Sequence, residues 1–264
     1  MHKNLIIIIS VGFLVFFNSF FNGFVWDDEE QIINNSVIHS LKNIPVIFSG
    51  GAFNSGGTGK LLGIYYKPLM TMSFALIYSL VGLKPFLYHF VAVILYISNA
   101  CLVYLLLSKF FDKEKSLLLS LLFLVHPLYS EVALYMANMQ DLLYFFFGML
   151  GLLTLNYWSI LFFLLSLLSK ETGVVFIVIA GIYTLIFNKT KIKKVFISGI
   201  IAVLIYSLMR FGMAKIYFSS YEIAPIAGLD LVGRIMNIPA MLWYYLSNFV
   251  IPWNLSINQH WIIQ

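Results

Sequence analysis

Ionisable side chains are rare in this chain, so those beside apolar segments give the first indication of chemistry. Asp27 and Asp28 directly follow an apolar segment, and Lys67, Lys170 and Arg210 stand at the ends of other apolar segments. A carboxylate can accept the proton of a hydroxyl group, and Lys and Arg can bind a phosphate group. The pattern therefore predicts a site for a substrate that carries phosphate beside a group that must lose a proton.

A purely structural interpretation of the same residues stays open. Long cationic side chains at helix ends also reach the membrane interface, and Lys170 can simply pair with Glu171. The acidic run at residues 27–30 can likewise be solvated without any further role. We favour a site because carboxylates and cations occur together, and ionisable groups at membrane depth usually face a cavity or a partner.

The composition identifies lipid as the solvent of this chain. Of its 264 residues, 61% are hydrophobic and 10% are charged, and the mean hydropathy is +0.92. A soluble domain carries about 25% charged residues. The formal net charge of +5 comes with no basic patch, so nucleic-acid binding is not predicted. The single cysteine, Cys101, excludes an internal disulfide.

The apolar segments predict an all-α integral membrane protein, a single domain over residues 1–264 with about seven to eight transmembrane helices. The first helix, residues 5–24, is expected to be retained because no small-residue cleavage site follows it. The segment at 68–83 is short enough to lie in the outer interface instead of crossing. Other predicted helices are residues 86–108, 195–211 and 241–252, with an outer loop at 215–239.

Residues 116–188 are expected to cross the membrane four times. Polar breaks at 126–127, 138–141, 156–157 and 169–171 divide this stretch into short helices. Short helices would leave a recess in the membrane where polar groups can be hydrated.

The distribution of charged residues predicts the orientation, because the acidic residues break an even division of the basic ones. With the N-terminus inside, the inner face has eight basic and two acidic residues, and the outer face has eight basic and nine acidic residues. The predicted inner set is Lys3, Lys109, Lys113, Lys115, Lys189, Lys191, Lys193 and Lys194. Because cytoplasmic loops are rich in Lys and Arg, we expect a multi-pass protein of a bacterial plasma membrane or its equivalent, with the N-terminus cytoplasmic and the active face extracytoplasmic.

Four short motifs stand in order along the chain: residues 24–28 (FVWDD), 65–69 (YYKPL), 126–132 (HPLYSEV) followed by Asp141, and 168–171 (LSKE). In order and spacing they resemble the membrane part of the transmembrane and tetratricopeptide-repeat O-mannosyltransferase-like proteins. That family belongs to the C-type (GT-C) glycosyltransferase superfamily, with the protein O-mannosyltransferases as relatives. The resemblance covers roughly residues 11–256.

The resemblance implies a GT-C helix bundle whose first outer loop, residues 25–67, carries acidic residues and interfacial helices. It implies a hexosyltransferase that moves a mannose-like sugar from a polyprenyl-phosphate carrier to an acceptor hydroxyl, on protein Ser/Thr or on a glycan. Relatives have more helices, and tetratricopeptide repeats are expected after them. A fragment or non-catalytic subunit completed by a second subunit is therefore one alternative, and a lipid or solute transporter is another.

The resemblance also assigns roles residue by residue. Asp27 or Asp28 matches the acidic pair of the loop, and we prefer Asp27 as the general base because it lies at the membrane surface. Lys67 stands where the family usually has Arg. The predicted substrate- and phosphate-binding residues are Tyr66, Lys67, His126, Glu131, Asp141, Lys170, Glu171 and Arg210. No metal is predicted with certainty, and His126 with Glu131 is the pair that could hold a divalent cation.

Overall fold

A computed structural model of the chain describes residues 2–54, 61–217, 225–253 and 255. Contacts between residues divide the chain into two compact units. The first unit comprises residues 1–125 and 129–217, and the second comprises residues 126–128 and 218–264. Each unit is described by itself below.

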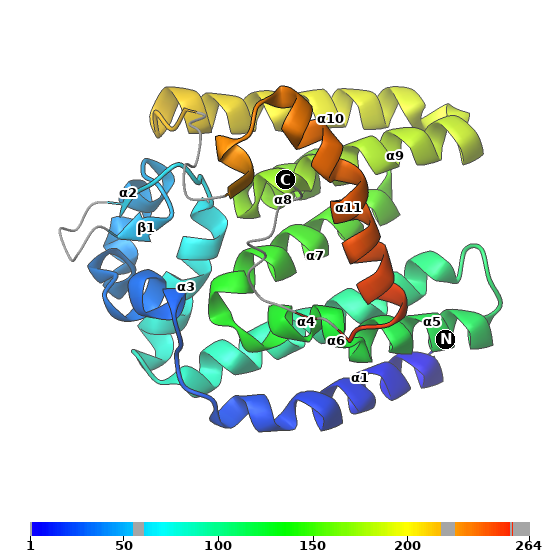
Figure 1. Cartoon of the computed structure of the whole chain (residues 1–264), viewed down its shortest axis with the longest axis horizontal. Helices are drawn as coiled ribbons and strands as arrows, with labels where there is room; N and C mark the ends of the chain where they lie inside the picture. The colour runs from blue at the N-terminus through cyan, green and yellow to red at the C-terminus, as the bar shows by residue number, and fades with distance from the viewer. Residues whose placement is uncertain (1, 55–60, 218–224, 254, 256–264) are drawn as a thin grey trace. The chain divides into compact units, whose positions relative to one another are not determined.

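The first unit is built from helices that lie side by side, with α1 along one edge and α10 along the other (Figure 1). In chain order they are α1 (His2–Phe16, continued by η1, Phe17–Phe21), α3 (Pro68–Val81), α4 (Pro85–Leu107), α5 (Lys113–Val125), α6 (Pro127–Leu134), η5 (Met136–Asn138), α7 (Met139–Thr154), α8 (Ser159–Ser169), η6 (Glu171–Gly173), α9 (Val174–Phe187), η7 (Lys189–Lys191), α10 (Ile192–Ser207) and η8 (Leu208–Met213). The predicted all-α membrane fold class is confirmed.

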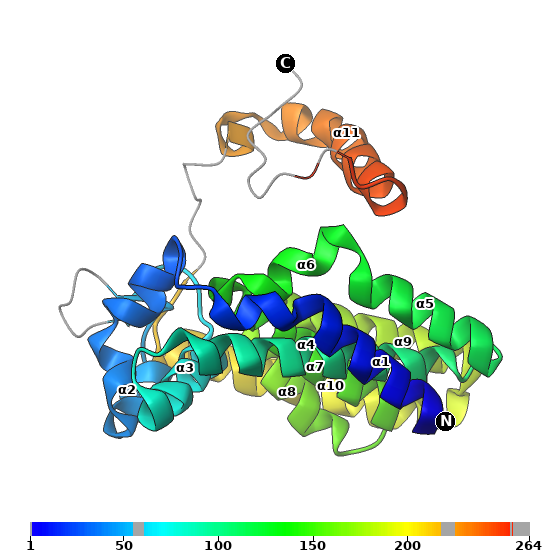
Figure 2. The same ribbon diagram turned by 90° about the horizontal axis from the view of Figure 1, so that it is seen from below.

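The segment between α1 and α3 holds the short helices that the resemblance implies. They are η2 (Glu29–Ile33), η3 (Ser36–His39), η4 (Leu41–Asn43) and α2 (Ile44–Phe48), followed by the two-residue strands β1 (Phe53–Asn54) and β2 (Leu61–Leu62). The strands are antiparallel, with Phe53 opposite Leu62. Figure 2 shows this segment and α3 together at one end of the long helices, while the N-terminus lies at the other end.

Fewer helices in the described part of the chain are long and apolar enough to cross a membrane than the seven to eight that the sequence predicts. Among the described residues, four helices are long and apolar enough, and the bent pair α5–α6 would make a fifth. Three further helices are apolar but shorter: Pro68–Val81, Ser159–Ser169 and Glu171–Phe187. The short helices between residues 113 and 187 agree with the four predicted breaks in this stretch.

The backbone shows how the helices begin or end at three of these breaks. Pro127 is the first residue of α6, which meets α5 at 61°, and proline lacks the N–H that would continue α5. Leu155 takes a left-handed conformation that ends α7, and the Asn156 side chain then accepts the Trp158 N–H at 2.9 Å. Lys170 is extended (φ −160°) and ends α8.

The helix ends opposite the first loop carry the lysine-rich segments. Near the N-terminus, the Asn4 amide donates to the Lys113 carbonyl at 3.1 Å and so joins α1 to α5. The Phe110 ring lies 5.6 Å from that of Phe187 at the end of α9. Lys194 lies over the Tyr157 ring at 5.7 Å, just past the end of α7. We call this side of the first unit the basic end.

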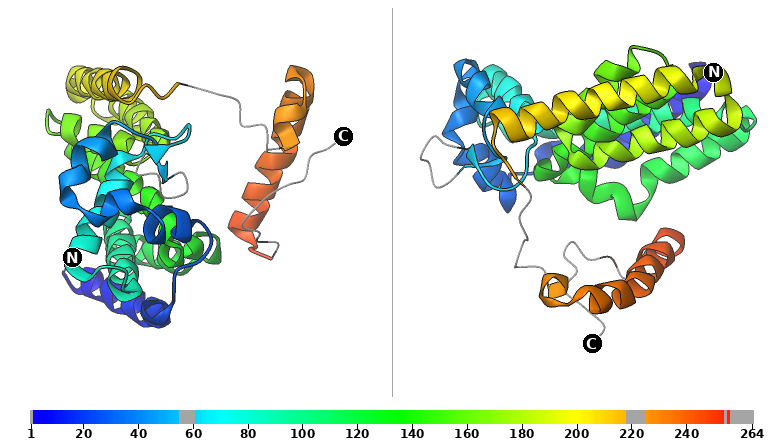
Figure 3. Two further views of the ribbon diagram at one scale, coloured as in Figure 1. Left: turned by 90° about the vertical axis from the view of Figure 1, so that its left-hand side faces the viewer. Right: turned by 90° about the horizontal axis from the view of Figure 1, so that it is seen from above.

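Two glycines allow α7 to approach its neighbours closely. A Cβ atom on Gly148 would overlap the Phe176 ring of α9, and one on Gly151 would overlap the Phe163 ring of α8. Because well-packed interiors leave no spare volume, these glycines fix the spacing of the three helices. Figure 3 shows α9 lying beside α10.

The second unit contains η9 (Pro225–Gly228) and α11 (Leu231–Val250). The Asp230 side chain caps α11 by accepting the Gly233 N–H at 2.8 Å. The predicted outer loop at 215–239 is therefore wrong over its second half, because this cap starts a helix that continues through Pro239. Within the described residues, α11 is not among the helices apolar enough to count as spans.

Candidate functional site

The two adjacent acids after the first helix have different surroundings. The Asp28 side chain is buried, with 1% of its surface exposed. Its Oδ2 accepts the Val25 N–H at 3.1 Å, and its Oδ1 accepts the Ala137 N–H at 2.8 Å. Burial raises the Asp28 pKa to about 6 even though these hydrogen bonds favour the carboxylate. Asp28 thus fastens the first loop to η5.

Asp27, in contrast, is exposed. Its backbone N–H donates to the Tyr135 hydroxyl at 3.1 Å, which holds the residue beside the α6–α7 junction. Burial of the Tyr135 phenol, together with the negative charge of Asp27, raises the Tyr135 pKa. Of the two predicted catalytic acids, Asp27 is therefore the one that a substrate can reach.

Lys67 is a buried cation that forms no ion pair with any residue in the described part of the chain. Its Nζ atom lies 4.3 Å from the centre of the Tyr65 ring. Burial lowers the Lys67 pKa to about 8, and the negative charges of Glu171, Asp141 and Asp27 partly oppose this shift. Lys67 therefore lies within electrostatic reach of three carboxylates and can still accept an anionic partner.

Lys170 pairs across helices rather than with its sequence neighbour. Its Nζ lies 2.6 Å from Asp141 Oδ1, and 5.7 Å from the centre of the Tyr144 ring. The simple pairing of Lys170 with Glu171 is therefore not formed. Glu171 instead has a buried Oε2 atom without a hydrogen-bond partner among the described residues.

The structure thus brings together residues from four separate segments of the sequence. We call them the charged cluster: Asp27, Lys67, Asp141, Lys170 and Glu171. They stand just before η2, just before α3, at the start of α7 and between α8 and α9. These helix ends lie opposite the basic end, since α7 begins at the charged cluster and finishes beside Tyr157.

The predicted ligand pair, Glu131 and His126, is divided between the two units, and each residue is described in its own unit. Glu131 Oε1 accepts a hydrogen bond from the Asn138 amide at 3.0 Å, within the α6–α7 junction. His126 belongs to the second unit, where its Nε2 lies 3.0 Å from the Phe249 carbonyl oxygen. Among the residues that the structure describes, no group of three or more His, Cys, Asp or Glu side chains could hold a metal ion. A divalent cation at this pair stays a prediction.

Tyr66 and Arg210 form hydrogen bonds that hold the backbone near Lys67, and their predicted role in substrate binding stays a prediction. The Tyr66 hydroxyl donates to the Phe48 carbonyl at 2.9 Å and its side chain is fully buried. Arg210, also buried, donates to the Ile64 carbonyl at 3.2 Å and to the Tyr206 hydroxyl at 3.0 Å. These bonds attach the backbone just before Lys67 to α2 and to the end of α10.

Two tyrosines were missed as site residues from the sequence. Tyr65 contacts the Lys67 ammonium, whereas the sequence favoured its neighbour Tyr66. Tyr135 holds Asp27 from the far side of the loop. The signal for Tyr65 was its position two residues before Lys67; no local pattern points to Tyr135, which is 108 residues from its partner.

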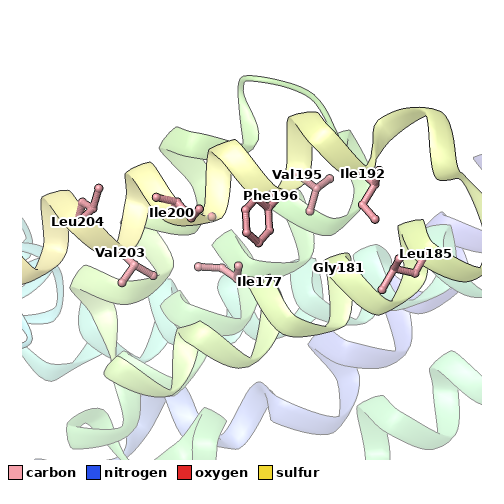
Figure 4. Close-up of a pocket in the computed structure, with 10 residues that line it drawn as sticks. Ile177, Gly181, Leu185, Ile192, Val195, Phe196, Ile200, Val203 and Leu204 are labelled. Carbon is pink, nitrogen blue, oxygen red and sulfur yellow. The ribbon is translucent and has the colours of Figure 1, made fainter.

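An apolar groove of about 350 Å³ runs between α9 and α10 (Figure 4). Ile177, Gly181 and Leu185 line it from α9, and Val203 and Leu204 are among the lining residues from α10. The α9 wall begins one turn after η6, and the α10 wall leads on to η8. The groove therefore extends along the bundle toward the helix ends that carry the charged cluster.

These features describe a multi-pass helical membrane protein with a cluster of acids and cations at one end of its bundle. No family model and no solved structure matches the chain. Sequence relatives do match. The mouse protein O-mannosyl-transferase TMTC3 is 29% identical over 141 residues, covering 53% of this chain and 15% of that protein. The Caenorhabditis elegans protein O-mannosyl-transferase F38B6.6 is 30% identical over 162 residues, covering 57% and 22%.

Mouse protein O-mannosyl-transferase TMTC4 gives a similar result, with 28% identity over 158 residues. Homologues over about half of this chain are thus named protein O-mannosyl-transferases, which confirms the resemblance seen in the four motifs. The chain spans less than a quarter of the length of these curated relatives.

Proposed function

We propose that this chain is the membrane part of a GT-C-type glycosyltransferase. It moves a mannose-like sugar from a polyprenyl-phosphate carrier to an acceptor hydroxyl, on Ser or Thr of a protein. One observation carries the proposal: an exposed carboxylate, Asp27, and a buried cation, Lys67, belong to one cluster at the helix ends, and Lys67 forms no ion pair with any residue that the structure describes. The names of the homologues support the type of reaction.

The cluster contains the groups that such a transfer needs. Asp27 accepts the proton of the acceptor hydroxyl, and the oxygen of that hydroxyl forms a bond to the anomeric carbon of the sugar. The bond from that carbon to the phosphate oxygen breaks, and the carrier leaves as a polyprenyl phosphate with one more negative charge. Lys67 stabilises this charge, and its burial strengthens the interaction because the local dielectric is low.

The groove between α9 and α10 supports a lipid-linked donor. Its lining is aliphatic and aromatic, as an isoprenoid chain requires, and its walls adjoin η6 and η8. In the proposed complex the chain of the carrier lies along the groove, and its phosphate lies in the charged cluster. Membrane lipid fills the groove when no donor is bound.

We further propose that the charged cluster faces the extracytoplasmic side. The support comes from the basic end, where Lys109 and Lys191 are close enough for their charges to interact. Lysine-rich loops stay in the cytoplasm. The acceptor and the lipid-linked sugar then meet at the outer surface.

The test measures the transfer rate of purified protein with a polyprenyl-phosphate sugar and an acceptor peptide. It compares substitutions at two exposed acids of the run at residues 27–30. Asp27→Asn should lower the transfer rate by about 10² to 10⁴-fold, because a neutral amide cannot accept the proton. The matched control is Glu30→Gln, which neutralises a nearby exposed acid and should leave the rate within about twofold of wild type. Wild-type rates in Asp27→Asn would overturn the assignment.

The same assay separates the alternative in which this chain is a non-catalytic subunit. The specific reason to keep this alternative is that the chain covers 15% of the mouse TMTC3 protein that it matches. In this alternative a second polypeptide supplies further residues. Wild-type protein that transfers nothing alone, and transfers when a partner subunit is added, would favour it.

A further inference from the structure

Trp26, next to Asp27, has an uncommon backbone conformation. Its φ is +50°, a left-handed value that bulky residues rarely adopt. Among the described residues, two other non-glycine residues have positive φ, Leu155 and Lys215. Leu155 ends α7, and Lys215 follows Ala214, the C-cap of η8; left-handed residues commonly close a helix at such positions. Trp26 precedes a helical turn instead, so helix termination does not explain it.

Hydrogen bonds on both sides hold this turn in place. Asp28 accepts the Val25 N–H through its side chain, and its own N–H donates to the Val25 carbonyl at 3.0 Å. The Glu29 N–H donates to the Trp26 carbonyl, also at 3.0 Å. Tyr135 accepts the Asp27 N–H from another segment. A strained residue persists only when its surroundings fix it, and such residues concentrate at functional sites.

The Trp26 ring is presented to the outside rather than packed. Its side chain is 64% exposed, and its aromatic neighbour in the described part of the chain is Tyr135, with ring centres 6.1 Å apart at 82°. A large ring therefore stands exposed beside the exposed carboxylate of Asp27.

A second exposed tryptophan, Trp158, provides a comparison for the exposure and backbone conformation of Trp26. Trp158 lies at the basic end, is 68% exposed and has φ −62°, in the right-handed helical region. Trp residues at membrane interfaces need no special backbone conformation. Anchoring in the interface thus accounts for Trp158, but it gives no reason for the left-handed turn at Trp26.

We propose that the Trp26 indole is the binding platform for the pyranose ring of the donor sugar, a role that rests on the proposed function. The apolar C–H face of a pyranose packs well on the flat face of a large aromatic ring. The next residue is Asp27, so a sugar on the indole would place its anomeric carbon close to the proton acceptor. The left-handed turn keeps ring and carboxylate in a fixed relation.

The decisive variant is Trp26→Gly, because glycine adopts positive φ without strain. It should fold at least as stably as wild type, with an equal or higher Tm, while the KM for the donor rises about tenfold or more and the KM for the acceptor peptide stays unchanged. Trp26→Phe should restore part of the donor affinity. The matched control, Trp158→Ala, should leave both KM values within about twofold of wild type.

Each other result contradicts a defined part of this inference. A donor KM within twofold of wild type in Trp26→Gly overturns the inference and leaves the proposed function standing. A rise in the acceptor KM alone overturns the assignment to the donor sugar. A lower Tm and a weaker donor affinity, with no rescue by Trp26→Phe, would show that the ring is only structural. Wild-type protein without transferase activity overturns the proposed function, and the inference with it.

Discussion

Asp27 and Asp28 are adjacent in sequence, yet their carboxylates lie in different surroundings. Asp28 is buried and accepts two backbone N–H groups, whereas Asp27 is exposed. The sequence could predict that an acidic pair stands at the membrane surface. It could not assign the two roles, because the partner of Asp28, Ala137, is 109 residues away.

This difference predicts that two alanine substitutions affect the stability of the protein unequally. Asp28→Ala leaves the buried Ala137 N–H without its acceptor, at a cost of about 1–3 kcal/mol, and also removes the acceptor of the partly buried Val25 N–H. Asp27→Ala removes an exposed side chain and should change stability by less than about 0.5 kcal/mol. Thermal unfolding in detergent measures both. Equal Tm values for the two variants would contradict the structural role of Asp28.

Lys67 predicts how donor use depends on pH. Burial lowers its pKa to about 8, so the ammonium group is charged below pH 8 and neutral above it. The kcat/KM for the donor, which reports the ionisation of the free enzyme, should therefore fall as pH rises through about 8. Lys67→Arg stays charged and should remove this fall, whereas Lys67→Met should be weak at every pH. An alkaline fall that persists in Lys67→Arg would assign it to another group.

At the scale of helices, the predicted breaks between residues 113 and 187 agree with the structure. Pro127 and Asn156 stand at two of them, and these residues can be read from the sequence. The apolar pattern predicts a helix only after Pro239, whereas α11 begins at Leu231, because the Asp230 side chain caps it and Pro239 lies inside it. The pairing of Lys170 with Asp141 was not predictable, since it depends on how α7 and η6 pack.

The packing of α7 predicts a contrast between two glycine substitutions. Gly148→Ala would place a methyl group against the Phe176 ring and force α7 and α9 apart, which should cost about 1–3 kcal/mol. Gly181→Ala adds its methyl group where nothing lies within 4 Å. It should therefore stabilise α9 by up to about 1 kcal/mol through helix propensity. Thermal unfolding of both variants checks the spacing, and a Gly148→Ala variant as stable as wild type would contradict it.

At the scale of the whole molecule, the sequence predicted which residues gather at each end of the first unit better than it predicted their contacts. Charges at helix ends follow from the positions of apolar segments, so Lys67, Asp141 and Lys170 were expected on one side. Which of them pair, and which stay without an ion pair, depends on burial. Burial in turn depends on side chains such as Tyr65 and Tyr66, whose positions beside Lys67 are set only when the chain has folded.

The arrangement of the two ends makes the orientation of the protein directly testable. Cys101 is the single cysteine, so Cys101→Ala provides a background without native thiols. Into it are introduced Glu29→Cys, which lies in the first loop beside the charged cluster, or Lys115→Cys, which lies at the basic end; both native side chains are exposed. A membrane-impermeant maleimide is then applied to intact cells.

Because positive loops remain in the cytoplasm, the maleimide should label the Glu29→Cys protein in intact cells and the Lys115→Cys protein only after permeabilisation. A denatured sample of each variant controls for expression and thiol reactivity. The reverse pattern would place the charged cluster in the cytoplasm, and transfer at the outer surface would then be excluded. It would leave the geometry of the cluster unchanged, because the ion pair of Lys170 with Asp141 and the burial of Lys67 do not depend on which way the chain is inserted.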